Sequence, residues 1–218
     1  MIIAIDGPAG AGKSTIAKSI ARKLGYLYLD TGAMYRALTY KILEDNVDIK
    51  DEAKISEIAR NITIDLINNP DGSLKVLLNK SDVTLKIREP RITKFVSDIA
   101  KIKDVRLVML DLQRKLGKKG NCILDGRDIG TVVFPDAEKK FYLDADFKER
   151  VNRRFIELKT MGQEITSDAV DKDLSNRDRI DSTREFAPLK KADDAIYVDT
   201  TNMSIEQVID TILKHILT

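Results

Sequence analysis

The sequence predicts an α/β protein in which helices cover both faces of a mostly parallel β-sheet. Short apolar runs alternate with segments of helical periodicity, and they occupy residues 1–5, 26–29, 122–124, 140–143 and 195–198. A glycine-rich segment follows the first run directly. This order is typical of a parallel sheet core whose ligands lie beyond the carboxyl ends of the strands.

The glycine-rich segment matches the pattern G-x-x-x-x-G-K-[ST] without a mismatch. It comprises Gly7, Pro8, Ala9, Gly10, Ala11, Gly12, Lys13, Ser14 and Thr15, and apolar residues at helical spacing follow it. Glycines let backbone N–H groups point at phosphate oxygens, while Lys13 supplies a charge for β- and γ-phosphates and Ser14 a hydroxyl for Mg²⁺. A chance glycine-rich turn is the alternative, but the strand before it and the helix after it favour a phosphate-binding loop.

The composition predicts one globular unit. The chain has 218 residues, of which 43% are hydrophobic and 33% charged, and 37 basic against 35 acidic residues give a net charge of +2. This balance does not indicate a nucleic-acid or membrane surface. The single cysteine, Cys122, lies in an apolar run and cannot form an internal disulfide, so we expect a buried thiol in a cytoplasmic protein.

Two segments depart from the strand–helix alternation. Residues 61–67, 74–78 and 83–87 have the pattern of short strands around the turn Asn69-Pro70-Asp71-Gly72, so we expect a small antiparallel insert. Residues 149–161 form a basic helical pattern that Gly162 interrupts before a second charged helix. We expect these two helices to form a short lid.

The first polar cluster follows the second predicted strand. Asp30 and Thr31 are residue types that cap helices. Arg36 lies one helical turn further on, from where its guanidinium can reach a phosphate. A surface arginine remains the alternative for Arg36.

The second polar cluster ends the third apolar run. Asp125 stands where a carboxylate of the Walker-B type orders Mg²⁺ beside a phosphate loop. Arg127 adds a forked donor for phosphate, and Asp128 adds a second carboxylate. A turn with a salt bridge is the alternative.

The third polar cluster covers residues 177–185. On a helix, Arg177, Asp181 and Arg184 share one face at spacings of four and three. A solvated face with ion pairs explains this pattern as well as a lid whose arginines neutralise developing charge.

These clusters together resemble the bacterial cytidylate kinase family, of the nucleoside monophosphate kinase fold, over essentially the whole chain. The motifs that carry the resemblance are Ile5-Asp6-Gly7-Pro8, Asp30-Thr31-Gly32-Ala33-Met34-Tyr35-Arg36, Val105-Arg106 with Gln113-Arg114, residues 125–135 and residues 177–189. The run D-G-R-D-x-G-T-V-V-F-P at 125–135 is the most specific of them.

The resemblance implies a (d)CMP kinase that transfers a phosphoryl group from ATP to CMP or dCMP in pyrimidine metabolism. It implies a core of about residues 1–35, 100–146 and 185–218, an acceptor-binding region with the antiparallel insert at about 36–99, and a lid at about 147–184. We also expect a monomer that binds neither nucleic acid nor membrane.

The resemblance further assigns roles to site residues. Lys13, Arg127 and Arg177 would be catalytic, and Ser14 and Asp125 would hold Mg²⁺. The acceptor would be bound by Thr31, Arg36, Ser97, Arg106, Arg127, Asp128, Arg177, Asp181 and Arg184. Among these, Ser97, Arg106 and Asp128 would read the cytosine, whose N4 donor and N3 and O2 acceptors suit a carboxylate beside hydroxyl or arginine donors.

Two other functions are compatible with the phosphate loop. A kinase of the same fold for another nucleoside monophosphate or a small metabolite would share Lys13 and Asp125 and differ at the base-reading residues. A nucleotide-binding switch without enzymatic activity would bind ATP without turnover.

Overall fold

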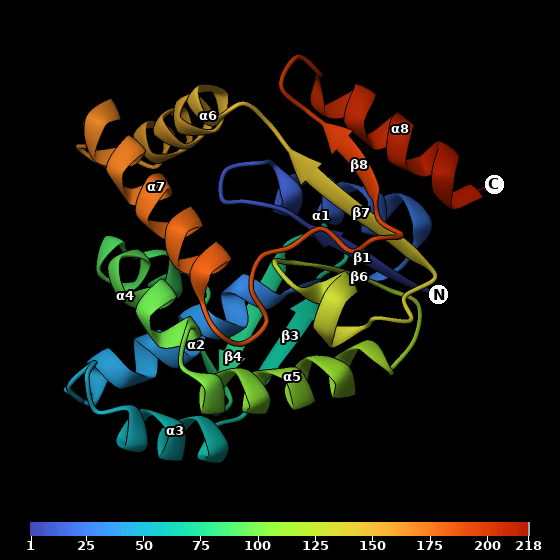
Figure 1. The fold of residues 1–218 in the computed structure, drawn as a ribbon. Helices are drawn as coiled ribbons and strands as arrows, with labels where there is room; N and C mark the ends of the chain where they lie inside the picture. Colours follow the sequence, from blue (N-terminus) through green and yellow to red (C-terminus); the bar gives the residue numbers. More distant parts are fainter. Residues whose placement is uncertain (218) are drawn as a thin grey trace.

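The computed structural model describes residues 1–217 and contains two β-sheets of unequal size (Figure 1). The larger is five-stranded, with all neighbouring strands parallel. In spatial order its strands are β2 (Leu27–Asp30), β6 (Cys122–Gly126), β1 (Ile2–Asp6), β7 (Lys139–Asp144) and β8 (Ile196–Asp199). Each apolar run expected to be a strand lies in this sheet, so the predicted fold class is confirmed.

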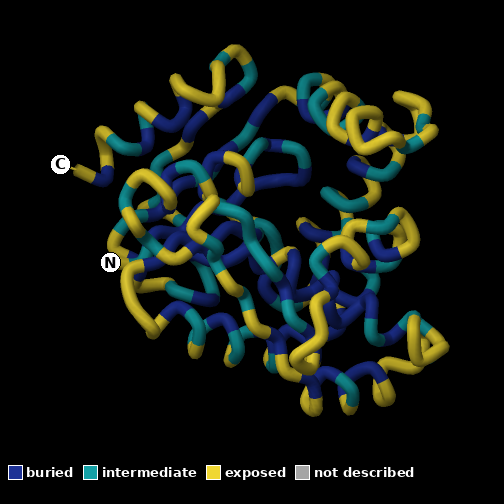
Figure 2. The backbone as a smooth tube through the Cα atoms, turned by 180° about the vertical axis from the view of Figure 1, so that it is seen from behind, coloured by how far each residue is buried: buried dark blue, intermediate teal, exposed yellow. Residues whose placement is uncertain are grey.

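Helices cover both faces of the large sheet because alternate residues of each strand point to opposite sides. Ile3 and Ile5 of β1 pack in one core with α1 (Lys13–Leu24) and α8 (Ile205–Leu217). Ala4, between them, faces a second core that includes residues of α5 (Lys103–Gly117) and of a π-helical turn, η2 (Ile129–Val133). The buried trace therefore runs through the centre of the molecule, while the outer turns of the helices are exposed (Figure 2).

A separate core lies under the small antiparallel sheet. The strands are β3 (Ile64–Asn68), β4 (Leu74–Leu78) and β5 (Ser81–Asp82), and the helices that pack with them are α2 (Thr31–Glu44), α3 (Glu52–Asn61) and α4 (Pro90–Ala100). The predicted antiparallel insert is therefore present. It gives the chain a second body of packed side chains beside the large sheet.

The third strand of this insert is not where the sequence predicts it. Residues 83–87 form a turn and the start of the 3-10 helix η1 (Lys86–Arg88) instead of a strand. The carboxylate of Asp82 accepts hydrogen bonds from the backbone N–H and the hydroxyl of Thr84, which closes a local turn. The Val83 N–H still donates to the carbonyl oxygen of Val76 in β4, but the Val76 N–H donates to the Thr84 hydroxyl instead of to a backbone carbonyl. Val83 and Ile87 are buried while Leu85 is 84% exposed, so the burial follows a helical period and not the alternation of a strand.

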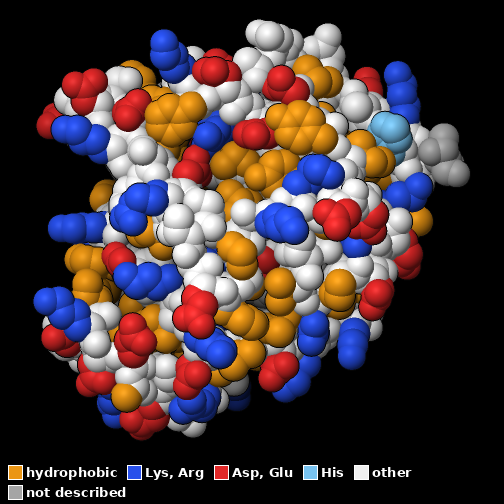
Figure 3. Space-filling model, viewed as in Figure 1, with side chains coloured by type: hydrophobic (Ala, Val, Ile, Leu, Met, Phe, Trp, Pro, Cys, Tyr) orange, Lys and Arg blue, Asp and Glu red, His pale blue; other side chains and the backbone are white. Residues whose placement is uncertain are grey.

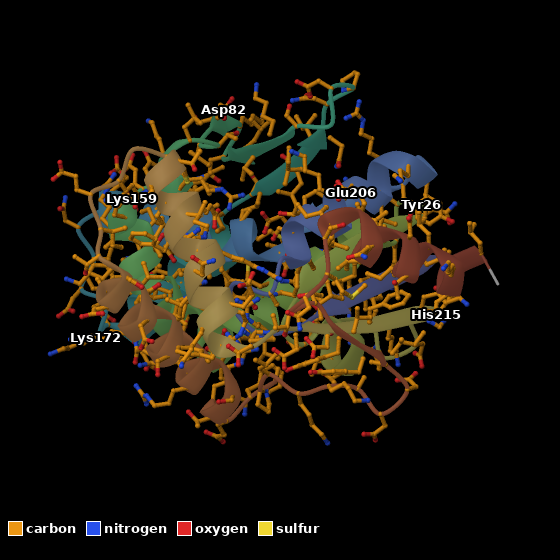
Figure 4. The ribbon with its side chains drawn as sticks, turned by 90° about the horizontal axis from the view of Figure 1, so that it is seen from above. Tyr26, Asp82, Lys159, Lys172, Glu206 and His215 are labelled. Atoms are coloured by element: carbon orange, nitrogen blue, oxygen red, sulfur yellow. The ribbon has the colours of Figure 1, made fainter. Side chains whose placement is uncertain are left out.

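The expected helix pair of residues 147–184 is also present. It consists of α6 (Phe147–Thr160) and α7 (Ser167–Thr183), which pack through Val151, Leu158, Val170 and Leu174. Lys172 points away from this core into solvent (Figure 4), whereas the ammonium of the exposed Lys159 lies 5.7 Å from the centre of the Phe155 ring at the edge of the core. Among residues 1–217, no helix combines the length and apolar character needed to cross a bilayer.

Candidate active site

A cavity of about 640 Å³ lies at the carboxyl ends of β1, β2 and β6. It is lined by the phosphate loop from Ala9 to Thr15 and by side chains of α2, α4, α5, α6, α7 and the start of α8. Every residue predicted to bind the acceptor or Mg²⁺ lines it, namely Ser14, Thr31, Arg36, Ser97, Arg106, Asp125, Arg127, Asp128, Arg177, Asp181 and Arg184. Gly7 and Pro8, predicted to bind ATP, are not in the lining, and the carbonyl oxygen of Pro8 accepts a hydrogen bond from Lys13.

The phosphate loop depends on glycine where the backbone takes positive φ. Gly7 has φ 147°, and a Cβ there would stand 1.9 Å from the carbonyl oxygen of Leu143 in β7. Gly12 has φ 84° but open space around it. The loop is therefore pressed against the sheet at Gly7 and free at Gly12, where α1 begins and its first N–H groups meet the cavity.

Lys13 is the buried cation of the loop. Its side chain folds back so that Nζ donates a hydrogen bond to the carbonyl oxygen of Pro8 at 2.6 Å. Burial lowers the pKa of Lys13, the positive charge of Arg127 lowers it further, and Asp125 opposes both. An anionic ligand placed between Lys13 and Arg127 would relieve their repulsion.

The Asp125 carboxylate is surrounded by oxygen atoms of neighbouring hydroxyl groups. Ser14 Oγ donates a hydrogen bond to its Oδ2 at 2.7 Å, and the Tyr28 hydroxyl donates to Oδ1 at 2.9 Å. Burial raises the pKa of Asp125, and the nearby charge of Asp30 raises it further. A carboxylate and a hydroxyl are ligands that suit Mg²⁺, and a bound cation would remove the cost of burying this charge. Tyr28 was not singled out from the sequence because a tyrosine in a strand has no signal beyond its core position.

Four buried side chains and the partly buried Arg127 form an ion-pair network, which we define as Arg106, Arg127, Asp128, Asp181 and Arg184. Arg106 Nη2 lies 2.6 Å from Asp128 Oδ2, and Arg127 Nε lies 2.8 Å from Asp181 Oδ2. Arg184 bridges the two carboxylates at 3.5 Å each. Burial opposes ionisation of Asp181, but Arg127 and Arg184 hold its pKa below the usual value. Asp128 and Arg106, the predicted base readers, thus lie side by side at the cavity wall.

Further arginines concentrate positive charge in the cavity. Arg36 is only 9% exposed and donates to the Thr93 hydroxyl at 2.8 Å, which excludes the alternative of a surface arginine. Burial lowers the pKa of Arg36, and the charge of Arg177 is the next cause. Arg88 and Arg154 line the same cavity. On the outer face in Figure 3, by contrast, basic and acidic side chains are interspersed. Convergent arginines in a cavity suit a ligand with several phosphates.

Asp30 and Thr31 were both predicted as helix-capping residues, but only Asp30 caps α2. Asp30 caps α2 by accepting a hydrogen bond from the N–H of Ala33 at 2.8 Å, and it pairs with Arg88 at 2.9 Å. Thr31 Oγ1 donates to the carbonyl oxygen of Asp125 at 2.6 Å instead of capping the helix. Thr31 therefore ties α2 to the end of β6 and still lines the cavity.

Sequence reasoning missed three arginines that line the cavity, Arg88, Arg153 and Arg154. Arg153 of α6 donates to the hydroxyl and the carbonyl oxygen of Thr200, at 2.9 and 2.6 Å. Arg154 pairs with Glu157 at 2.7 Å and Arg88 with Asp30. Arg153 and Arg154 lie in a basic stretch that looks like a solvated helix face, and Arg88 follows no motif, so only the tertiary structure identifies them.

A phosphate loop beside a magnesium-type carboxylate and a cavity rich in arginine defines a P-loop phosphotransferase. The model of the family described as cytidylate kinase matches residues 3–218. The chain belongs to the cytidylate kinase family.

Individual relatives agree with this assignment. The chain is 50% identical to a cytidylate kinase of Clostridioides difficile over 216 residues, covering 99% of this chain and 98% of the relative. It is 52% identical to a cytidylate kinase of Fusobacterium nucleatum, covering 99% and 97%. A shikimate kinase structure from Bacteroides thetaiotaomicron superposes with a TM-score of 0.51 at 12% identity, covering 100% of this chain and 99% of that one, which is a likeness of fold.

Proposed function

We propose that this protein transfers the γ-phosphoryl group of ATP to CMP or dCMP, forming CDP or dCDP in pyrimidine nucleotide metabolism. Membership in the cytidylate kinase family makes it a phosphotransferase with ATP as donor. The observation that supports the assignment of roles is the continuity of one cavity from the phosphate loop to the ion-pair network. Donor phosphates and an acceptor phosphate can therefore approach each other in a single site.

Residues 7–15 form the proposed donor-phosphate site. Backbone N–H groups of the loop and the Lys13 ammonium would bind the phosphates, with Arg127 and Arg177 beside the transferring group. Transfer between two phosphate oxygens needs no protein nucleophile, so these residues would act by position and charge. Ser14 and Asp125 would hold Mg²⁺, which when bound neutralises charge on the donor phosphates.

The proposed acceptor site reads cytosine with charged and polar side chains. Asp128 would accept from the N4 amino group, and Ser97 and Arg106 would donate to N3 and O2. Uracil presents an acceptor at position 4 and a donor at N3, which would leave buried groups unpaired at roughly 1 to 3 kcal/mol each. Arg36 and Arg127 would hold the acceptor phosphate. The sugar and phosphates would be contacted by Arg177, Asp181 and Arg184, with Thr31 adjacent.

The two parts outside the large sheet have proposed roles in closure. Residues 36–99 would carry the acceptor, and residues 147–184 would close over the phosphates and exclude water, which protects ATP from hydrolysis. We further propose that the protein acts as a cytoplasmic monomer. Slow ATPase activity in the absence of acceptor is the expected sign of closure.

An acceptor panel tests the function. ADP formation from Mg-ATP is measured with CMP, dCMP, UMP, AMP, GMP and dTMP in parallel, beside a control without acceptor. Turnover led by CMP and dCMP supports the proposal. Preference for another acceptor would contradict the base-reading assignment, and stable ATP binding without turnover would favour a nucleotide-binding switch.

A further inference from the structure

The segment after Asp128 is a single π-helical turn that begins beside a buried carboxylate. The turn η2 spans Ile129–Val133 and directly follows Arg127 and Asp128. Asp6 is 4% exposed, and it is the last residue of β1, immediately before the phosphate loop. Its Oδ1 accepts a hydrogen bond from the N–H of Ile129 at 2.9 Å, and its Oδ2 accepts one from the N–H of Gly130 at 2.7 Å.

These two N–H groups have no partner inside the turn. The backbone bonds of a π-helix run from each N–H to the carbonyl oxygen five residues earlier. The N–H of Val133 accordingly donates to Asp128 and that of Phe134 to Ile129. The first N–H groups of the turn must find acceptors elsewhere, and being buried they would be costly to leave unpaired. The Asp6 carboxylate supplies both acceptors.

A cation holds the opposite end of the same turn. Arg114 of α5 donates from Nε to the carbonyl oxygen of Val133 and from Nη2 to that of Val132, each at 2.9 Å. Lys140 of β7 donates to the carbonyl oxygen of Pro135 just beyond. Acceptor oxygens at the N–H end and cations at the carbonyl end match the partial charges that a helical turn exposes, and ionisation of Asp6 strengthens this match.

The turn η2 connects the ion-pair network to the strand that carries the phosphate loop. Its preceding residues are Asp128, bonded to Arg106, and Arg127, bonded to Asp181. At the other end of the connection, Asp6 precedes Gly7, whose backbone is pressed against β7. A shift of the turn would move the ion-pair network relative to the phosphate loop.

We propose that Asp6 and Arg114 are positioning residues that clamp the turn Ile129–Val133 from its two ends and so fix Asp128 and Arg127 against the acceptor. Neither Asp6 nor Arg114 is among the residues that line the cavity. Asp6 also joins the strand that carries the phosphate loop to the segment that recognises the base. The inference rests on the proposed function, because it assumes that Asp128 reads cytosine.

Two substitutions and a matched control test the clamp in the full-length protein. Asp6→Asn replaces one carboxylate acceptor by an amide that faces an N–H group, and Arg114→Gln removes the forked donor. Glu138→Gln is the control, because Glu138 Oε2 accepts a hydrogen bond from the N–H of Ile2 at 2.7 Å, at the other end of β1. All three remove a charged partner of backbone groups, but only the first two touch the turn.

The first readout needs no substrate. Amide hydrogen exchange at Ile129 and Gly130, compared with Leu124 in the neighbouring strand, should accelerate roughly ten-fold or more in Asp6→Asn and stay unchanged in Glu138→Gln. Exchange that is unchanged in Asp6→Asn would overturn the proposal. The exchange measurement tests the clamp even if the wild-type protein fails to phosphorylate CMP. That failure would contradict only the proposed function.

The second readout is the ratio of kcat/KM for CMP to that for UMP, which cancels any loss of folded protein. The ratio should fall roughly ten-fold in Asp6→Asn and in Arg114→Gln, and the control should keep the wild-type ratio. Arg114→Gln acts away from the phosphate loop, so it decides the matter if Asp6→Asn does not fold. An unchanged ratio in Arg114→Gln would overturn the proposal.

Discussion

The phosphate loop and the ion-pair network both face the same cavity but are built in different ways. The loop is one stretch of consecutive residues whose shape comes from glycine backbone and the start of α1. The network joins residues 22, 54 and 56 positions apart through side-chain charges. The loop's geometry is therefore local and depends on few side chains, whereas each member of the network depends on partners from other elements.

The largest effect is expected where the loop does use a side chain. Lys13→Ala should lower kcat/KM for CMP at saturating ATP by roughly 1000-fold, because it removes a buried ammonium from the proposed donor-phosphate site. Lys18→Ala, an exposed position on the same helix, is the control. Steady-state kinetics check this, and a loss below ten-fold would mean that the arginines alone neutralise the charge.

A single substitution in the ion-pair network should affect the partners of the substituted residue as well. Asp128→Asn leaves Arg106 and Arg184 buried with a neutral neighbour, so we expect kcat/KM for CMP to fall roughly 100-fold and the preference over UMP to vanish. Asp136→Asn, exposed in the same loop region, should behave as wild type. Parallel kinetics with CMP and UMP measure both, and a preserved preference would remove Asp128 from base reading.

Substitutions at Gly7 and Gly12 distinguish the cost of positive φ from the cost of a steric clash in the phosphate loop. Gly7→Ala should destabilise the fold by about 2 kcal/mol or more, because its Cβ collides with a backbone oxygen as well as requiring positive φ. Gly12→Ala has open space and should cost only about 1 kcal/mol of strain. Urea unfolding compares the two variants. Equal losses would show that strain alone accounts for Gly7.

The most gradual effect is expected in the pH dependence of stability at Asp6, which joins the two regions. Burial raises the pKa of Asp6 to about 7, while hydrogen bonds from Gly130 and Ile129 oppose the rise. Between the unfolded pKa and about 7, the folded state keeps a proton that the unfolded chain has released, so stability must fall as pH rises. Wild type should lose up to about 1.4 kcal/mol per pH unit relative to Asp6→Asn. Unfolding free energies at several pH values check the slope, and parallel profiles would contradict it.

This contrast also explains what the sequence could predict. The phosphate loop and the five parallel strands were predictable because both depend on contiguous patterns. Residues 83–87 were predicted wrongly as a strand, since β-branched composition concealed the turn that Asp82 closes. Arg88, Arg154 and Tyr28 gave no sequence signal, because their roles depend on elements brought together only by folding. Among the proposed acceptor residues, Ser97 and Arg106 were named through family resemblance alone. Position and spacing had already picked out Arg36, Arg127, Asp128, Arg177, Asp181 and Arg184 as polar clusters.

The helix pair α6 and α7 is attached directly to the phosphate loop. Ala9 of the phosphate loop packs inside the core of α6 and α7, its N–H donates to Asp178 at 3.2 Å, and its carbonyl oxygen accepts from Arg150 at 2.9 Å. Ala9 thus belongs both to the phosphate loop and to the core that holds α6 and α7 together. We therefore expect a ligand that orders the loop to restrict the motion of α6 and α7, and by reciprocity we expect an ordered helix pair to strengthen the binding of that ligand.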